Sequence, residues 1–309
     1  QFSTTTKLKG IATFVLGANA FGGSSGALKA AAGTAEGATT FNYDVRLNFD
    51  TSFTGKDLLR TTLRAGNFAD SGFGNAGLNL LEVAFQEECG TGADCGDVVA
   101  INRLFYQFPV GDGFTATVGA RVRQDDMLAM WPSVYPADTV LDIFTYAGAP
   151  GAYSLNLGAG AGLWYQKNGW SASINYVSAN GDVANPSVGG IGTAGSEESF
   201  TAQVGYAGSN WGAAIAYNYG NGDGPNAGTP SVLGLAGITG SNNSVGLSAY
   251  WQPSTTGWVP SISAGWGYTS FSEDDTIVDF DSNAAAQSWY VGLQWNDAFI
   301  KGNALGMAV

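Results

Sequence analysis

The sequence predicts an all-β protein, a transmembrane antiparallel β-barrel with long external loops and short periplasmic turns. Three observations predict it: apolar and polar residues alternate strictly from 41 to 50, charged residues are scarce, and aromatic residues gather beside the predicted short turns. Alternation gives a strand one apolar and one polar face, and about ten residues are enough for a tilted strand to cross a bilayer. A surface strand of a soluble sandwich alternates in the same way, so recurrence of the pattern decides between the two.

Composition narrows the class of protein. Charged residues make up 12% of the 309 residues, about half the share usual in a soluble domain. No window approaches the roughly 18 uncharged apolar residues of a membrane helix. The formal net charge of −13 argues against a nucleic-acid partner, for which a basic surface is expected. Without histidine a Ser-His-Asp hydrolase is excluded, and no carboxylate pair stands apart as a catalytic acid and base. We therefore predict neither an enzyme nor a cofactor.

The alternating pattern recurs through the chain, with short turns after every second strand as in bacterial barrels. Long outer segments are predicted at 18–39, 67–97, 124–151, 178–198, 220–242 and 271–285. Turn counting makes 67–97 one outer loop without a crossing. In the strand 114–123, the residues predicted to face lipid are Phe114, Ala116, Val118, Ala120 and Val122.

The pattern ends inside an apparent strand, GNALGMAV, at Val309. An open barrel would expose an unpaired edge to lipid, so we expect further strands and about 16 in the complete barrel. Residues 1–309 are interpreted as a single barrel domain, incomplete at its C-terminal end.

Aromatic residues stand beside successive short turns: Tyr165 and Trp170, Tyr206 and Trp211, Trp251 and Trp258, and Trp295. Rings with an apolar body and one polar handle prefer the bilayer interface. The placement predicts the inner aromatic girdle of a membrane barrel.

All arginines fall between residues 46 and 123, each on the polar side of its predicted strand. A charged side chain at mid-bilayer on the lipid face costs about 2–4 kcal/mol, which favours an inward placement. The candidate pore-lining residues are Arg46, Arg60, Arg64, Arg103, Arg121, Arg123 and Asp44. Either they form ion pairs that fill the barrel interior, or they form a basic wall that sets ion preference.

The segment 124–151 carries four acids, Asp125, Asp126, Asp138 and Asp142. An ordinary outer loop is one interpretation, because long outer loops are common in such barrels. The other is a constriction loop folded into the lumen, whose acids would face the arginine wall and create a transverse field.

Two cysteines, Cys89 and Cys95, lie close together in ECGTGADCG. In an oxidising compartment they would close a small disulfide loop, whereas a lone cysteine pair without histidine is a weak metal site. No metal site is predicted elsewhere, because the acids between 273 and 281 lack ligand spacing.

Three stretches carry a resemblance to a known family: FSTTTKLKGIATFVLG near the start, TFNYDVRLNFDTSFTGKDLLRTTLRAGNF at 40–68, and RLFYQFPVGDGFTATVGAR at 103–121. They resemble the porin domain of cyanobacterial outer-membrane porins, which belong with the carbohydrate-selective (OprB-type) porins. The likeness continues to GNALGMA and so covers essentially the whole chain.

The resemblance implies a homotrimeric outer-membrane channel that passes inorganic ions and small hydrophilic solutes by general diffusion, with some members linked to iron uptake. Family members also hold peptidoglycan through an N-terminal S-layer-homology domain, which we expect this chain to lack. Carbohydrate or iron uptake through a selective channel and a structural outer-membrane anchor remain the alternatives.

Overall fold

The computed structural model describes residues 5–74, 80–83, 85–87, 96–136, 141–222, 224–225, 227–229, 232, 240–272 and 284–309. These residues form one 13-stranded sheet in which each strand pairs with its neighbours in the chain, and every pairing is antiparallel. The described part of the chain holds no helix with the length and apolar character that crossing a membrane requires. The predicted all-β antiparallel architecture is confirmed.

The strands are β1 (Thr5–Gly17), β2 (Thr40–Ser52), β3 (Leu58–Gly66), β4 (Ala100–Pro109), β5 (Phe114–Arg123), β6 (Leu157–Lys167), β7 (Trp170–Ser178), β8 (Glu198–Ala207), β9 (Trp211–Asn221), β10 (Ser241–Trp251), β11 (Ser261–Ser272), β12 (Ala285–Asn296) and β13 (Ala304–Ala308). The helical elements are α1 (Gly26–Glu36) and two 3-10 turns, η1 (Gln124–Met127) and η2 (Asp142–Phe144).

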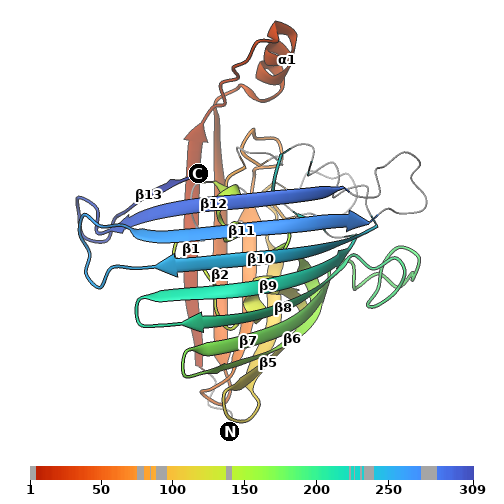
Figure 1. Cartoon of the computed structure of the whole chain (residues 1–309). Helices are drawn as coiled ribbons and strands as arrows, with labels where there is room; N and C mark the ends of the chain where they lie inside the picture. The colour runs from red at the N-terminus through yellow and green to blue at the C-terminus, as the bar shows by residue number, and fades with distance from the viewer. Residues whose placement is uncertain are drawn as a thin grey trace.

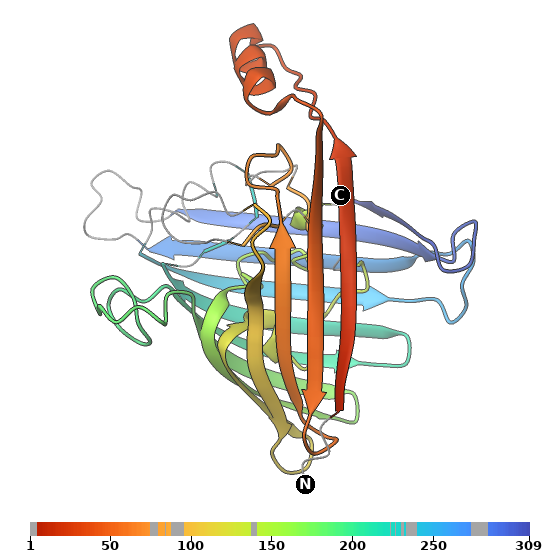
Figure 2. The ribbon, with the colours of Figure 1, turned by 180° about the vertical axis from the view of Figure 1, so that it is seen from behind.

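The sheet coils around an interior. Figure 1 shows β1 and β2 upright and β7 to β12 running across them, and Figure 2 shows the upright strands from the other side. Right-handed strand twist, added from one strand to the next, turns the strand direction in this way. In the described sheet β1 and β13 are the two edges and do not pair with each other.

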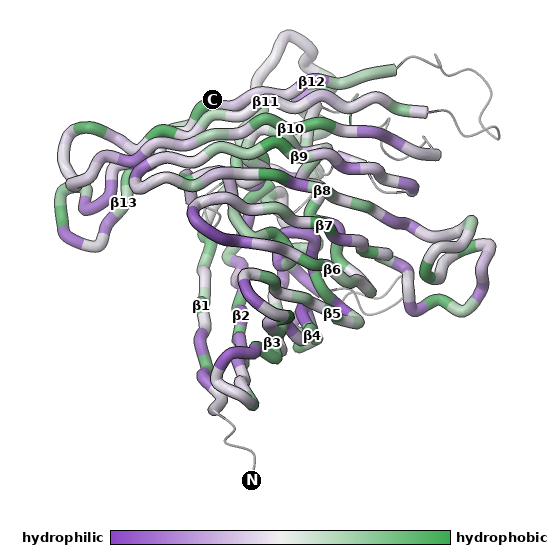
Figure 3. The backbone as a smooth tube through the Cα atoms, turned by 60° about the horizontal axis from the view of Figure 1, so that its bottom comes forward, coloured by the Kyte–Doolittle hydropathy of each residue, from purple (hydrophilic) through white to green (hydrophobic). Residues whose placement is uncertain are grey.

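Each strand separates a polar inner face from an apolar outer one. In β7 the serine and asparagine side chains are buried while Trp170 and Ile174 are exposed. In Figure 3 the hydropathy changes at short intervals along the strands and not in long apolar blocks. A soluble sandwich buries the apolar side of such strands, whereas here the apolar side points outward, as a membrane barrel requires.

The prediction that Val122 faces lipid is wrong. The register between β5 and β6 shifts between Gly119 and Val122, and an irregularity of this kind interrupts the strict alternation of side chains between the two faces. Val122 is completely buried and packs in a cluster with Phe105, Met127 and Val177.

The outer segment between β1 and β2 contains a helix that the sequence did not predict. The hydroxyl of Ser25 accepts a hydrogen bond from the Leu28 amide and caps the N-terminus of α1. The helix buries none of its residues and stands away from the sheet in Figures 1 and 2. Its alanine-rich composition favours a helix without tertiary support.

The short turns lie together at one end of the sheet. Asn168 and Gly169 join β6 to β7 with φ values of 53° and 84°, the left-handed geometry of the predicted tight hairpin turn. Aromatic rings cluster beside these turns: Trp170 and Tyr206 have centroids 5.1 Å apart, and Tyr206 and Trp211 are 5.3 Å apart. Neighbouring rings at strand ends form the predicted girdle.

Candidate functional site

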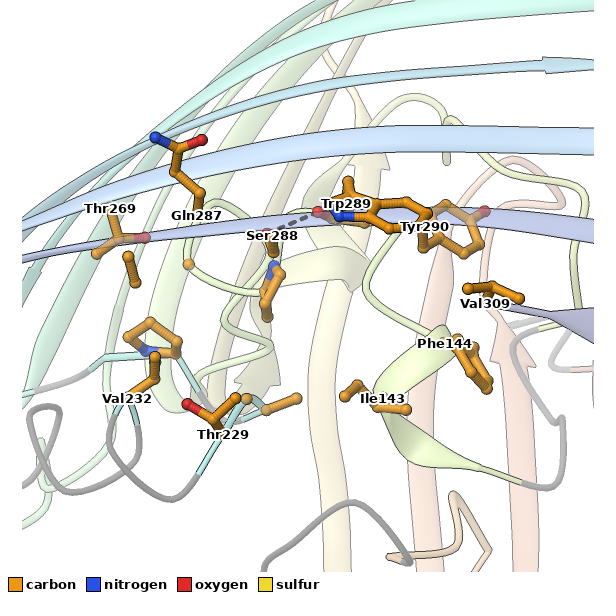
Figure 4. A pocket seen from close by; sticks show the side chains of 17 residues that line it. Ile143, Phe144, Thr229, Val232, Thr269, Gln287, Ser288, Trp289, Tyr290 and Val309 are labelled. Atoms are coloured by element: carbon orange, nitrogen blue, oxygen red, sulfur yellow. Dashed lines mark hydrogen bonds between the residues drawn. The ribbon is translucent and has the colours of Figure 1, made fainter.

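The described parts of the connection from β5 to β6, residues 124–136 and 141–156, lie against the inner face of the sheet and are called the inward segment. Both ribbon views place it between the upright strands and the crossing ones (Figures 1 and 2). Its backbone is held by wall side chains: Gln203 donates to the Met130 carbonyl at 2.9 Å and Ser248 to the Ala147 carbonyl at 2.7 Å. Figure 4 marks the bond that Ser288 donates to the Gly148 carbonyl at 2.8 Å.

Small residues on the wall make this close approach possible. An added Cβ on Gly265 would lie 1.8 Å from the Ala147 carbonyl oxygen, and on Gly246 it would lie 2.8 Å from the Ala149 methyl carbon. The same crowding by the inward segment affects wall glycines on other strands: Gly162, Gly205, Gly267 and Gly292. We call these glycines, with Gly246, Gly265 and the wall serines, the small-residue face.

A cavity of about 290 Å³ remains between the inward segment and the outer ends of β11 and β12. Figure 4 shows it lined by Ile143 and Phe144 on one side and by Ser288 and Tyr290 on the other. Its lining carries few charged or polar groups, so it suits packing better than the recognition of a polar solute.

The arginine wall lies on β2 to β5 and is defined as Arg46, Arg60, Arg64, Arg103, Arg121 and Arg123. Within the described residues, Arg60, Arg64, Arg103, Arg121 and Arg123 each pair with an acid. Arg60 binds Asp50 through two bonds of 2.8 and 3.1 Å, and Arg64 binds Asp44 in the same bidentate way. The other pairs are Arg103 with Asp126 at 2.8 Å, Arg121 with Glu87 at 3.0 Å, and Arg123 with Asp125. Arg46 faces Arg64 across the β2–β3 pairing.

The acids of the inward segment lie on this wall. Asp125 and Asp126 begin η1 directly after β5 and pair with Arg123 and Arg103. Burial by itself raises the pKa of Asp125, but the Arg123 guanidinium holds this pKa below its usual value. The sequence predicts that the acids of this segment face the arginine wall across an open lumen. Asp125 and Asp126 instead form direct ion pairs with that wall. Asp142 lies farther along and is also buried.

Residues 80–83 and 85–87 form a second inward segment, although all of 67–97 was predicted to lie outside. Glu87 is buried and accepts from Asn102 at 2.7 Å and from Arg121, and the Arg64 guanidinium lies 4.3 Å from the ring centroid of Phe85. The described parts of 67–97 add no strand to the sheet, as predicted. The available signal was Glu82 and Glu87, five residues apart in a largely apolar stretch.

The two inward segments join each other. Leu81 and Leu141 form an isolated antiparallel bridge, and the Asp142 amide donates to the Leu80 carbonyl at 3.0 Å. Beside this bridge the Glu82 carboxyl is hydrogen-bonded to Asp142, which also accepts from the Tyr146 hydroxyl at 2.7 Å. Burial, reinforced by Asp142, raises the pKa of Glu82 to about 8. A protonated Glu82 can donate a hydrogen bond to Asp142 and so helps to hold the junction together at neutral pH.

Part of the arginine wall lines an open space beside the inward segment. This second cavity, of about 330 Å³, is called the wall cavity, and its charged lining comprises Lys9, Arg46, Arg60, Arg103, Arg123 and Asp126. Neutral polar groups come from Asn48, Thr62 and Asn102. Pocket, inward segments and ion pairs thus occupy the same inner surface.

Three predicted site residues, Asp138, Cys89 and Cys95, lie outside the described residues. Among the residues that are described, no three His, Cys, Asp or Glu side chains are grouped to hold a metal ion.

Comparisons with known proteins give relatives by sequence and a neighbour by fold. The uncharacterized protein sll0772 of Synechocystis sp. is 28% identical over 331 residues, covering 100% of this chain and 58% of that protein. The uncharacterized protein alr4550 of Nostoc sp. is 27% identical over 343 residues, covering 99% of this chain and 55% of that protein. No protein-family model matches the chain.

The chain thus spans a little over half the length of these curated relatives. The solved structure of OprB from Pseudomonas putida has a TM-score of 0.57 and 13% identity, covering 99% of this chain and 74% of that one. At this identity the likeness concerns the fold alone. The 13 antiparallel strands with an inward connection have the fold of an outer-membrane porin.

Proposed function

We propose that the chain forms the channel domain of an outer-membrane porin through which inorganic ions and small hydrophilic solutes diffuse passively. The apolar outer side and polar inner side of the strands support insertion in a bilayer with a wet lumen. The resemblance to OprB-type porins and the fold likeness to OprB support the same assignment. We propose a homotrimer on the same grounds, and peptidoglycan contact only for segments outside this chain.

The observation that carries the proposal is the position of the inward segment. The inward segment, part of a connection of more than 30 residues, lies against the small-residue face. On the opposite side, the charged wall lines a cavity. We propose that the segment narrows the lumen beside the arginine wall, so that permeating solutes pass polar and charged groups.

The ion pairs of the wall favour a weakly selective channel. Each bidentate pair cancels most of the local charge of its guanidinium at distances beyond the Debye length. A solute that enters the narrowed lumen still contacts the paired charges directly. At such short range the field of each pair remains strong. Selective uptake of carbohydrate or iron is the narrower alternative and rests on the family resemblance.

Single-channel recording of the full-length protein in planar bilayers, with the reversal potential under a salt gradient, tests the proposal. The comparison variants are Arg60→Ala/Arg64→Ala/Arg121→Ala, which removes three wall cations, and Lys167→Ala, which removes an exposed turn cation paired with Asp112. We expect stable conductance steps whose preference shifts toward cations in the triple variant and stays unchanged in the control.

Steps with unchanged selectivity in the triple variant would retain the channel and reject the arginine filter. Absence of conductance from a folded, membrane-inserted protein would reject the channel and favour a structural anchor. Folding is checked independently by the mobility shift of unheated protein in gel electrophoresis.

A further inference from the structure

We propose that the wall cavity is a binding site for oxyanion groups, of the phosphate and sulfate class, carried by solutes that enter the lumen. The inference rests on the proposed channel function and names the solute chemistry that the channel would retain. Its basis is an excess of fixed cations around one space of about 330 Å³.

The charged side chains that line the wall cavity are mostly cations. Five cationic side chains line the cavity against a single lining carboxylate, Asp126. Two further acids, Asp50 and Asp125, pair with Arg60 and Arg123. Arg46 also takes part in an interaction of its own, so the charge excess is counted on the other four cations, which outnumber these three carboxylates although the chain as a whole carries −13. In a narrow lumen with low-dielectric walls, such a balance concentrates anions.

The guanidinium groups of the wall cavity keep N–H donors that their acidic partners do not use. A guanidinium has five N–H donors, and the acids occupy only some of them. Arg60 uses Nε and Nη2 for Asp50, and Arg123 uses the same two nitrogens for Asp125. Arg103 uses Nε for Asp126 and Nη1 for Asn102. Among the described contacts, Nη1 of Arg60 and Arg123 and Nη2 of Arg103 have no partner.

The guanidinium groups are also preorganised. The carboxylates paired with Arg60, Arg103 and Arg123 hold the planar groups in fixed orientations, so an incoming oxyanion would not have to order three flexible side chains. Planar donor forks match tetrahedral and planar oxyanions better than they match a spherical ion. The geometry therefore points to phosphate-like groups in preference to chloride.

The donors would be the same whether the oxyanion is free or attached to an organic solute. Inorganic phosphate and glycerol phosphate are the two probes that separate these sources. If both bind, the site recognises the group itself; if only one binds, the cavity also selects by size.

The experiment uses the full-length protein in planar bilayers in potassium chloride, with each probe added at constant ionic strength. We expect phosphate to reduce the chloride-carried current in a saturable way. Lys9→Gln is the test variant, because Lys9 is 65% exposed and its loss is compatible with folding. Lys167→Gln is the control, since Lys167 is also an exposed lysine with one aspartate partner but lies at a short turn.

Removing one charge at about 4 Å in water-like surroundings weakens a monovalent interaction roughly fivefold. We therefore expect the phosphate concentration for half-block to rise by at least about that factor in Lys9→Gln, and to be unchanged in Lys167→Gln. Arg46→Gln, which removes another cation of the cavity lining, should weaken the block in the same direction.

The outcomes separate the two proposals. Normal conductance steps without phosphate block would overturn the oxyanion site and leave the channel intact. If the wild-type protein does not conduct, the channel proposal fails, and the site is then decided by thermal unfolding of the detergent-solubilised protein. A phosphate-dependent rise in Tm that is lost in Lys9→Gln would support the site, and equal Tm values with phosphate and chloride would reject it.

Discussion

Gly265 of β11 and Ala147 of the inward segment touch through their backbones. A Cβ on Gly265 would lie 1.8 Å from the Ala147 carbonyl oxygen, and that carbonyl accepts a hydrogen bond from Ser248. The wall thus positions the inward segment by omitting a side chain where the segment passes. Any larger residue at 265 has to displace it.

Gly265→Val should therefore move the inward segment away from the wall and change the open-channel conductance. Overpacking of a closely fitted contact costs about 1–3 kcal/mol, which is enough to compete with a few hydrogen bonds. Ala264→Val is the matched control, because residue 264 is next in the chain and points outward. Equal single-channel conductance in the two variants would show that the segment does not depend on this contact.

The Glu82–Asp142 junction should loosen as the pH rises. The pKa of Glu82 is about 8 in the folded protein, against 4.5 for an unperturbed glutamate. Below about pH 4.5 both folded and unfolded states hold the proton, so the stabilisation from this group is fully present and does not change with pH. Between 4.5 and 8 only the folded state holds it, so stability falls as the pH rises through this window and is constant above it.

Glu82→Gln removes this titration while keeping a hydrogen-bonding side chain beside Asp142. We expect wild-type current noise to increase between pH 6 and pH 9 and the variant to show a smaller increase. Glu197→Gln is the control, because Glu197 lies exposed in another outer loop. The same pH dependence in all three proteins would exclude the junction as its origin.

Asp44→Asn should destabilise the folded barrel more than any exposed charge change. Asp44 and Arg64 are buried and joined by two hydrogen bonds, and removal of one partner of a buried pair costs about 3–5 kcal/mol. Asp112→Asn breaks an exposed pair with Lys167 and should cost about 0–1 kcal/mol. Thermal unfolding in detergent compares them, and similar Tm losses would contradict this ranking.

The strands could be predicted from sequence because their signal is local. In β11, Ile262, Ala264 and Trp266 alternate with inward Ser263 and Gly265, and a period of two is visible without any tertiary contact. The same alternation predicted that the arginines lie on the inner wall, and Arg60 and Arg64 do lie on one face of β3.

The features that could not be predicted from sequence depend on contacts between segments that are distant in the chain. The inward position of Glu87 follows from its bonds to Asn102 and Arg121, which are 15 and 34 residues away. The burial of Val122 follows from a register shift against β6. One signal was available: from Ser261 to Thr269 the inward positions of β11 are only serine, glycine and threonine, and such a face leaves room for a covering segment.

The outward side of the strands should tolerate apolar residues alone. Ile215 lies near the middle of β9 with its side chain 51% exposed, and an arginine facing lipid at mid-bilayer costs about 2–4 kcal/mol. Ile215→Arg should therefore reduce the folded fraction in lipid vesicles. Ile191→Arg is the matched control, because Ile191 is 61% exposed on an outer loop, where water solvates the new charge. Folding yield, measured by the gel shift of unheated samples, compares the two; equal yields would mean that the exposed face of β9 does not meet hydrocarbon.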